Sequence, residues 1–171
     1  MPTEDEDRAE ILRVHRDWWI ANYKWDIPLM RSCFPSGTAF LNHNLSGDPY
    51  FGREELTAFW EYFKDTPRAV PAVIQIWRLT VKGDIAWLVG EGNFETVAKP
   101  DQYLRTTEIY QRDDGDGNPE WKIWHFHCSE TAAMDHIRQP FGDSYESRGG
   151  MGYMPAEFGS SFSVTADQVV E

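Results

Sequence analysis

Apolar residues recur at helical spacing over residues 4–25, whereas farther along the chain they alternate with polar residues. The helical repeat follows Thr3, which can cap a helix, and it opens with four acidic residues that favour a helix start. Residues 4–25 therefore predict a first helix with one broad buried face. That face comprises Ile11, Leu12, His15, Trp18, Trp19, Asn22 and Trp25.

Two shorter helices and one short strand are predicted next. Residues 26–34 indicate a second helix, because a Pro-Ser-Gly segment then breaks the pattern. Residues 38–42 indicate a short strand, and residues 44–52, which are rich in Ser, Gly, Asp and Pro, indicate a loop. A third helix is predicted over residues 53–64, with a buried side that comprises Leu56, Phe59, Trp60 and Phe63.

Alternating Val, Ile and aromatic residues then predict strands separated by short turns. The predicted strands are residues 72–82, 85–98, 103–112 and 120–130. Short turns between successive strands favour an antiparallel meander. Helices followed by antiparallel strands predict an α+β domain, in which a curved antiparallel sheet wraps around three N-terminal helices. Such a cone-shaped fold encloses a cavity of the kind in which ligands bind.

Residues 131–171 form a C-terminal extension beyond a cone predicted over residues 1–130. Their glycine and serine content is consistent with a disordered tail. Large apolar groups are unfavourable in a fully solvated tail, which favours an arm that covers the cavity as a lid or packs on a second subunit. The apolar groups are Phe141, Tyr145, Met151, Tyr153, Met154, Phe158 and Phe162.

Composition excludes several classes of partner. The formal net charge is −12, so nucleic-acid phosphates and anionic membrane lipids are not expected partners. No apolar run approaches the length of a membrane span. Two cysteines without metal-ligand spacing, Cys33 and Cys128, and an acidic N-terminus without a signal-peptide pattern predict a cytoplasmic protein.

Three stretches of the sequence resemble a known superfamily. They are Gly37-Thr-Ala-Phe40, Phe59-Trp-Glu-Tyr-Phe63 and Trp121-Lys-Ile-Trp-His-Phe-His-Cys-Ser129. Over residues 8–130 the chain resembles the nuclear transport factor 2-like (SnoaL-like, cystatin-like) superfamily, and it is most similar to the association (hub) domain of calcium/calmodulin-dependent protein kinase II. The resemblance implies a cone-shaped fold that forms a homodimer or higher homo-oligomer through the sheet face.

The chain also departs from the hub domains. Those domains line their cavity with basic residues, whereas the matching positions here are Gly92, Glu108 and Cys128, so an anion-binding cavity is not expected. Free-standing members of the superfamily are often cofactor-independent enzymes, such as ketosteroid isomerase-like proteins, dehydratases and polyketide cyclases. This likeness implies a chain that works without a cofactor.

Strand alternation and the resemblance together select the residues that face the cavity. These are Gly90, Gly92 and Phe94 on one strand, Thr106, Glu108 and Tyr110 on the next, and Trp124, Phe126 and Cys128 on the last. Glycines at cavity-facing positions either leave room for a ligand or relax the sheet where it bends.

Glu108 is the first candidate catalytic residue, because a carboxylate in an apolar cavity can serve as a general base or acid. The alternative is a structural ion pair with Arg105 or Arg78. Tyr110, on the same face, either donates a hydrogen bond to an oxyanion or is a core tyrosine. His43, in the loop over the cavity mouth, either shuttles protons or is an exposed loop residue.

The predicted ligand is a hydrophobic, aromatic small molecule. The substrate-binding candidates are Asn42, Trp18, Trp60, Phe94, Thr106, Trp124, Phe126 and Cys128. For the three tryptophans and Phe126, the alternative is a place in the aromatic core. No metal site is predicted. His125 and His127 share one face but lack an obvious third ligand, and the turn at residues 114–118 departs from the calcium-loop pattern.

Two functions remain open. The first is a cofactor-independent lyase, dehydratase or isomerase in which Glu108 moves a proton with help from Tyr110 or His43. The alternative is a non-catalytic ligand-binding or oligomerisation module like the hub domain.

Overall fold

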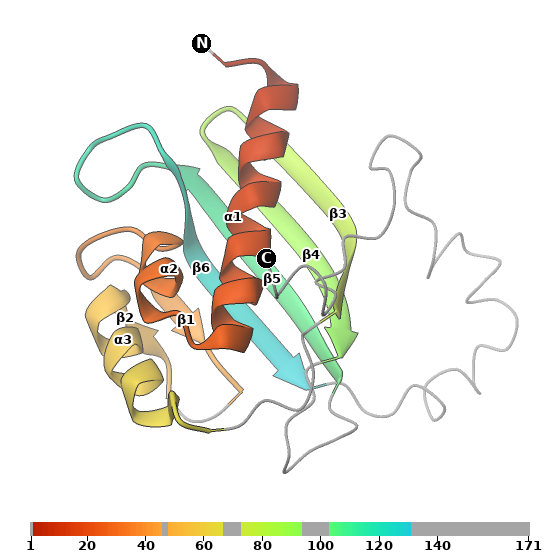
Figure 1. Cartoon of the computed structure of the whole chain (residues 1–171). Coiled ribbons are helices and arrows are strands. Elements are labelled where there is room, and N and C mark those ends of the chain that lie inside the picture. The colour runs from red at the N-terminus through yellow and green to blue at the C-terminus, as the bar shows by residue number, and fades with distance from the viewer. Residues whose placement is uncertain (1, 46–47, 67–72, 94–102, 131–171) are drawn as a thin grey trace, which may run out of the picture.

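The computed structural model describes residues 2–45, 48–66, 73–93 and 103–130 (Figure 1). Its helices are α1 (Glu4–Lys24), α2 (Ile27–Ser32) and α3 (Gly52–Phe63). Its strands are β1 (Leu41–His43), β2 (Tyr50–Phe51), β3 (Val73–Lys82), β4 (Ile85–Asn93), β5 (Tyr103–Arg112) and β6 (Trp121–Glu130). The predicted α+β order, in which helices precede a strand meander, is confirmed.

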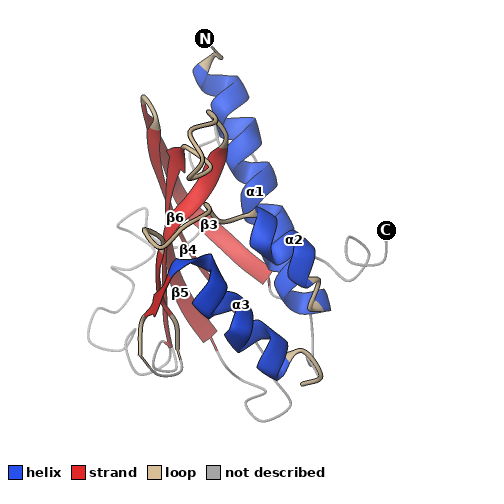
Figure 2. Ribbon diagram, turned by 90° about the vertical axis from the view of Figure 1, so that its left-hand side faces the viewer, coloured by secondary structure: helices blue, strands red, loops and turns tan. Residues whose placement is uncertain are grey.

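The described strands form one curved, unclosed sheet in the order β2-β1-β6-β5-β4-β3. Strands β3 to β6 pair antiparallel as predicted, while β1 joins β6 as a parallel neighbour. The helices lie against one face of the sheet, as the edge-on view of Figure 2 shows. We call this the concave face and the opposite one the outer face.

Helix α1 begins and ends close to where its sequence predicts. Thr3 and Glu6 form a capping box, in which the Thr3 hydroxyl accepts the Glu6 N–H and the Glu6 carboxylate accepts the Thr3 N–H. The helix ends at Lys24, and the C-cap residue Trp25 adopts a left-handed conformation with a φ of 55°. Between these ends, the buried side of α1 packs across the concave face.

A β-bulge in β6 changes which side chains face the helices. The register of β5 and β6 shifts after Ile109, so that Tyr110 pairs with Ile123 and Trp124 becomes the extra residue. Ile123 is buried, whereas Trp124 is half-buried and donates its indole N–H to the Asp113 carbonyl oxygen 2.7 Å away. The predicted place of Trp124 on the cavity face is wrong, because strict alternation does not continue through a bulge.

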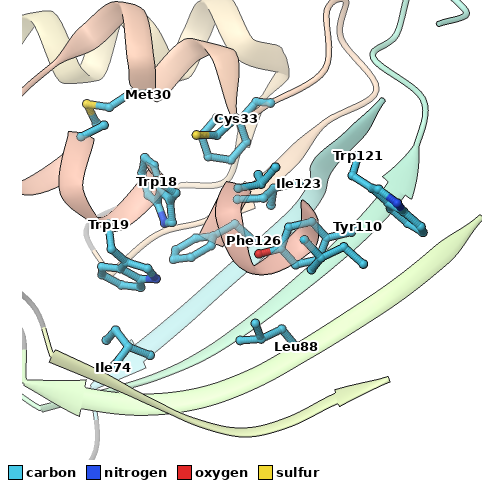
Figure 3. Close-up of a cluster of buried hydrophobic side chains, with 14 of the residues drawn as sticks. Trp18, Trp19, Met30, Cys33, Ile74, Leu88, Tyr110, Trp121, Ile123 and Phe126 are labelled. Atoms are coloured by element: carbon cyan, nitrogen blue, oxygen red, sulfur yellow. The ribbon is translucent and has the colours of Figure 1, made fainter. Parts of the chain in front are cut away.

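Aromatic rings fill the space between α1 and the sheet (Figure 3). The centroid of the Trp18 ring lies 5.5 Å from that of Phe126 on β6 and 5.6 Å from that of Trp60 on α3. Phe34 meets Trp18 edge-on at 5.0 Å. Each of these side chains is at most 3% exposed, and such burial contributes about 1.5–3 kcal/mol per large apolar side chain. One aromatic cluster therefore joins two helices to the sheet.

Several local predictions need correction or lie outside the described residues. The first strand covers residues 41–43 rather than 38–42, and part of the predicted loop forms β2. Phe63 is 37% exposed rather than buried, because α3 carries apolar side chains on both of its sides. Residues 94–98 of the predicted second strand, including Phe94, and the extension 131–171 lie outside the described residues. None of the described helices is long and apolar enough to cross a membrane.

Candidate functional site

Glu108 on β5 lies at the centre of a buried polar cluster. The Nδ1 atom of His15 is 2.9 Å from Glu108 Oε2, and the Trp19 indole N–H donates to Oε1 at 3.1 Å. The Tyr110 hydroxyl also donates to Oε2. Glu108, His15 and Tyr110 are 0% exposed, and Trp19 is 2% exposed. We call these four residues the Glu108 cluster.

Elements far apart in the sequence build the Glu108 cluster. His15 and Trp19 are one helical turn apart on the side of α1 that faces the sheet. Glu108 and Tyr110 are two residues apart on β5, so both point to the concave face, which α1 crosses (Figure 1). The helix thus contributes ring nitrogens, and the strand contributes the carboxylate and the hydroxyl.

Hydrogen bonding in the cluster suits an ionised carboxylate. An ionised Glu108 accepts from the Trp19 indole N–H, from the Tyr110 hydroxyl and, when His15 Nδ1 carries the ring proton, from His15 as well. Burial, together with the charge and the hydrogen bond of Glu108, raises the pKa of Tyr110 well above its ordinary value. Tyr110 therefore remains a hydroxyl donor at neutral pH.

The contact with Glu108 relates the position of the carboxylate to the tautomer of the His15 ring. When Nδ1 donates to the carboxylate, the neutral imidazole carries its basic lone pair on Nε2. A carboxylate in this position selects that tautomer and stabilises the imidazolium that forms when Nε2 takes up a proton. In that tautomer the pair would have the arrangement of a general base with a positioning carboxylate behind it.

Two further buried polar atoms lie on the concave side. In the part of the chain that the structure describes, neither the Trp18 indole N–H nor the Asn42 side-chain oxygen has a hydrogen-bond partner. Asn42 pairs with Phe126 across β1 and β6, and the Phe126 ring contacts Trp18. Leaving a buried polar atom without a partner costs about 1–3 kcal/mol. One donor and one acceptor therefore lie without partners in this buried layer of the described residues.

The remaining substrate-binding candidates take different positions. Thr106 and Cys128 pair across β5 and β6 and are buried on the concave face. Burial raises the pKa of Cys128 to about 11, so it is a poor nucleophile at neutral pH. Trp60 and Phe126 belong to the aromatic core, and Trp124 lies in the bulge.

His43 is not brought together with Glu108. It pairs with His127 across β1 and β6, whereas the preceding residue points to the concave face, so His43 lies on the outer face. Its ring centroid is 5.5 Å from that of His125 and 6.0 Å from that of His127. Among the described residues, no group of His, Cys, Asp or Glu side chains could hold a metal ion.

A family model of the SnoaL-like domain matches residues 11–134. The chain belongs to the SnoaL-like family. The match spans the whole Glu108 cluster and the sheet that carries it. No curated protein matches the chain.

Solved structures share the fold of this SnoaL-like chain. An NTF2-like protein from Streptomyces avermitilis, provisionally named a dehydratase, is 19% identical with a TM-score of 0.62, over 77% of this chain and 100% of that one. A cystatin-like-fold protein of unknown function from Nostoc punctiforme is 12% identical with a TM-score of 0.62, over 78% and 97%. A ketosteroid isomerase-like protein from Erwinia carotovora atroseptica is 13% identical with a TM-score of 0.58, over 73% and 96%. At such identities the similarity establishes the fold alone.

Strand alternation places Glu108 of the SnoaL-like domain on the concave face, but it does not reveal the partners His15 and Trp19. The available signal was a histidine within an otherwise apolar helix face, one turn before a tryptophan whose N–H needs an acceptor. The alternative ion pair with Arg105 is not formed, since the Arg105 Nε lies 4.0 Å from Glu91 instead.

Proposed function

We propose that this SnoaL-like protein is a cofactor-independent enzyme that moves a proton on a hydrophobic, aromatic small molecule. The observation that supports this function best is the buried pair of His15 and Glu108, with Nδ1 2.9 Å from Oε2. His15 is the proposed base, and Glu108 is a positioning residue. Trp19 and Tyr110 keep the carboxylate in place through their hydrogen bonds.

The two buried polar atoms that lack partners among the described residues, on Trp18 and Asn42, suggest which aromatic molecules would bind. The Trp18 indole N–H would donate to a carbonyl or hydroxyl oxygen, and the Asn42 side-chain oxygen would accept from a hydroxyl. A purely hydrocarbon ligand would leave both atoms without partners. The proposed substrate therefore carries a carbonyl and a hydroxyl group on an aromatic or polycyclic frame.

A C–H bond next to a carbonyl group is acidic enough to lose its proton to a histidine base. Nε2 of His15 would take the proton, and the electron pair of the broken C–H bond would form the double bond of an enolate. The imidazolium beside Glu108 would then return the proton to another carbon, which is an isomerisation. Alternatively, it would protonate a departing hydroxyl group, which leaves as water in an elimination. Both sequences balance without a redox partner.

The outer face supports a homodimer or higher homo-oligomer as a further part of the proposal. Ile85 and Trp87 on β4 are 48% and 37% exposed on that face, and clustered exposed apolar groups mark interfaces.

The same face favours the second candidate function, a non-catalytic oligomerisation module like a hub. Size-exclusion chromatography with light scattering would distinguish a dimer from a larger ring. We also propose that the protein is located in the cytoplasm.

Proton abstraction can be measured before the natural substrate is known. Aromatic hydroxyketones are incubated with the protein in D₂O, and loss of the hydrogen next to the carbonyl is followed by NMR. We expect exchange by the native protein to exceed that by His15→Gln by about 10²-fold or more. Thr107→Val is the matched control, because Thr107 adjoins Glu108 on β5 but faces away from it.

Binding and catalysis are separated by a thermal-shift screen of the same compounds. A ligand at 100 times its dissociation constant adds about 2.7 kcal/mol of stability. If a compound binds but its hydrogen exchanges no faster with the native protein than with His15→Gln, the enzyme proposal is wrong and the ligand-binding alternative is favoured. Neither binding nor exchange, in a panel that includes larger polycyclic ketones, would make the Glu108 cluster a purely structural network.

A further inference from the structure

An open groove of about 510 Å³ lies on α3, which stands beside β2 at the edge of the sheet (Figure 1). It is separate from the Glu108 cluster, because the opposite side of α3 carries Trp60 into the aromatic core. Its lining includes Asp48, Tyr50, Glu55, Phe59, Tyr62 and Phe63.

Four aromatic rings form a continuous row along the groove. The ring centroids of Tyr50 and Phe59 are 5.0 Å apart, and those of Phe59 and Phe63 are 4.8 Å apart. Tyr62 meets Phe63 edge-on at 4.8 Å, with 78° between the ring planes. Tyr62 is 81% exposed and Phe63 is 37% exposed, so core packing does not explain their aromatic character.

The groove is negatively charged. Asp48 and Glu55 contribute carboxylates, and none of the described residues that line it is a lysine, arginine or histidine. Lys64, which follows the helix, forms a salt bridge with Glu61, with 2.9 Å between Nζ and Oε2. Burial and, to a smaller extent, the charge of Asp48 raise the pKa of Tyr50.

We propose that this groove binds a small organic cation with a quaternary or methylated ammonium head group. The faces of aromatic rings attract such a cation, its methyl groups make apolar contacts with the rings, and the two carboxylates complement its charge. A metal ion would instead require several converging oxygen ligands, and a neutral ligand would gain no charge attraction from Asp48 and Glu55. The site does not depend on the chemistry proposed for the Glu108 cluster.

The test compares a cation with its neutral isostere. The full chain, labelled with ¹⁵N, is titrated with choline and separately with 3,3-dimethyl-1-butanol, in which carbon replaces the charged nitrogen. We expect choline to shift the amide signals of α3 with saturation in the millimolar range, and the alcohol to bind at least tenfold more weakly. Equal binding of both compounds, or no choline-induced shifts up to 50 mM, would overturn the proposal.

Variants on α3 locate the site. Tyr62→Ala removes an exposed ring without opening the core and should weaken choline binding at least fivefold. Glu55→Gln should weaken it as well, and more at low salt than at high salt. Glu54→Gln is the matched control, because the Glu54 carboxylate bonds to Arg31 on α2 rather than lining the groove. If Glu54→Gln weakens binding as much as Glu55→Gln does, the net charge of the protein attracts the cation and the proposed site is wrong.

Discussion

His15 and Glu108 lie 93 residues apart in the sequence, yet Nδ1 of the imidazole and Oε2 of the carboxylate are 2.9 Å apart and neither side chain is exposed. A buried pair of this kind is favourable only when its polar atoms are satisfied, and Trp19 and Tyr110 supply further donors to the carboxylate. Substitutions here therefore act on stability and on the His15 tautomer together, and the two effects need separate measurements.

Glu108→Gln is expected to preserve the fold and to change the tautomer of His15. The glutamine amide can donate to Nδ1, which would move the imidazole proton to Nε2 and remove the basic lone pair from that atom. We expect the free energy of unfolding to fall by about 1–3 kcal/mol, because one acceptor oxygen is lost. Urea denaturation measures the stability, and the ¹⁵N shifts of the His15 ring report the tautomer.

Glu108→Leu is the companion variant. It removes the acceptor of His15, Trp19 and Tyr110 at once, so its loss should exceed that of Glu108→Gln and reach about 3–5 kcal/mol. If the leucine variant is as stable as the native protein, these hydrogen bonds contribute nothing to the fold. An unchanged ring tautomer in Glu108→Gln would contradict the positioning role of the carboxylate.

Asp7 links the start of α1 to the ends of two strands, and its substitution should alter the acid stability of the protein. Its carboxylate accepts hydrogen bonds from Arg112 and from the Trp121 indole N–H, the latter at 3.0 Å. Although burial opposes the charge of Asp7, these hydrogen bonds and the charge of Arg112 lower its pKa. The resulting stabilisation is complete above the unfolded-state pKa, about 3.9, and is lost as the pH falls through the lower folded value.

Asp7→Asn should therefore lower the free energy of unfolding at pH 7 by about 2–3 kcal/mol and flatten its decline below pH 4. Urea denaturation between pH 7 and pH 3 measures both effects. Asp5→Asn, at an exposed position in the same turn, should change stability by less than about 0.5 kcal/mol. An equal loss at pH 7 and pH 3 for Asp7→Asn would mean that the ionised form is not what stabilises the fold.

Sequence alone predicted the features that depend on local pattern. The predicted first helix, residues 4–25, extends one residue beyond α1, and the predicted strand at 103–112 coincides with β5. Alternation also placed Glu108 and Tyr110 on one face. These predictions succeed because helix caps, turns and the two-residue period of a strand depend on residues that are close together in the sequence.

Features that depend on contacts between distant segments could not be predicted. The bulge at Trp124 lies in the pairing of β5 with β6, and β6 contains no glycine or proline that would indicate a bulge from the sequence. The parallel pairing of β1 with β6 places His43 on the outer face, away from Glu108. The partnership of His15 with Glu108 requires α1 to cross the sheet at one particular point, which only the packed core determines.

His125 on the outer face should make stability depend on pH in a second, higher window. Burial and the neighbouring imidazoles of His43 and His127 lower the pKa of His125. Below about pH 6.5 the unfolded chain then binds more protons than the folded chain, so stability falls as the pH is lowered toward the folded pKa of His125. His125→Gln should flatten the stability curve between pH 7 and pH 5, and His127→Gln, which removes only one cause of the His125 shift, should flatten it less. Equal slopes in the native protein and His125→Gln would contradict this origin.

Replacing Gly90 on β4 with alanine should destabilise the fold. The result would show whether this glycine is needed for packing against β3 or for leaving room for a ligand. A Cβ atom there would lie 2.8 Å from the carbonyl oxygen of Gln75 and 3.0 Å from Cγ2 of Ile74, both on β3. The close approach of β3 therefore requires glycine, and we expect Gly90→Ala to lower the free energy of unfolding by about 1–3 kcal/mol in urea denaturation. If Gly90 served only to leave room for a ligand, the alanine variant would keep the native stability and lose ligand binding instead. The contact with a backbone atom favours the first outcome, since β3 can move away only by weakening its pairing with β4.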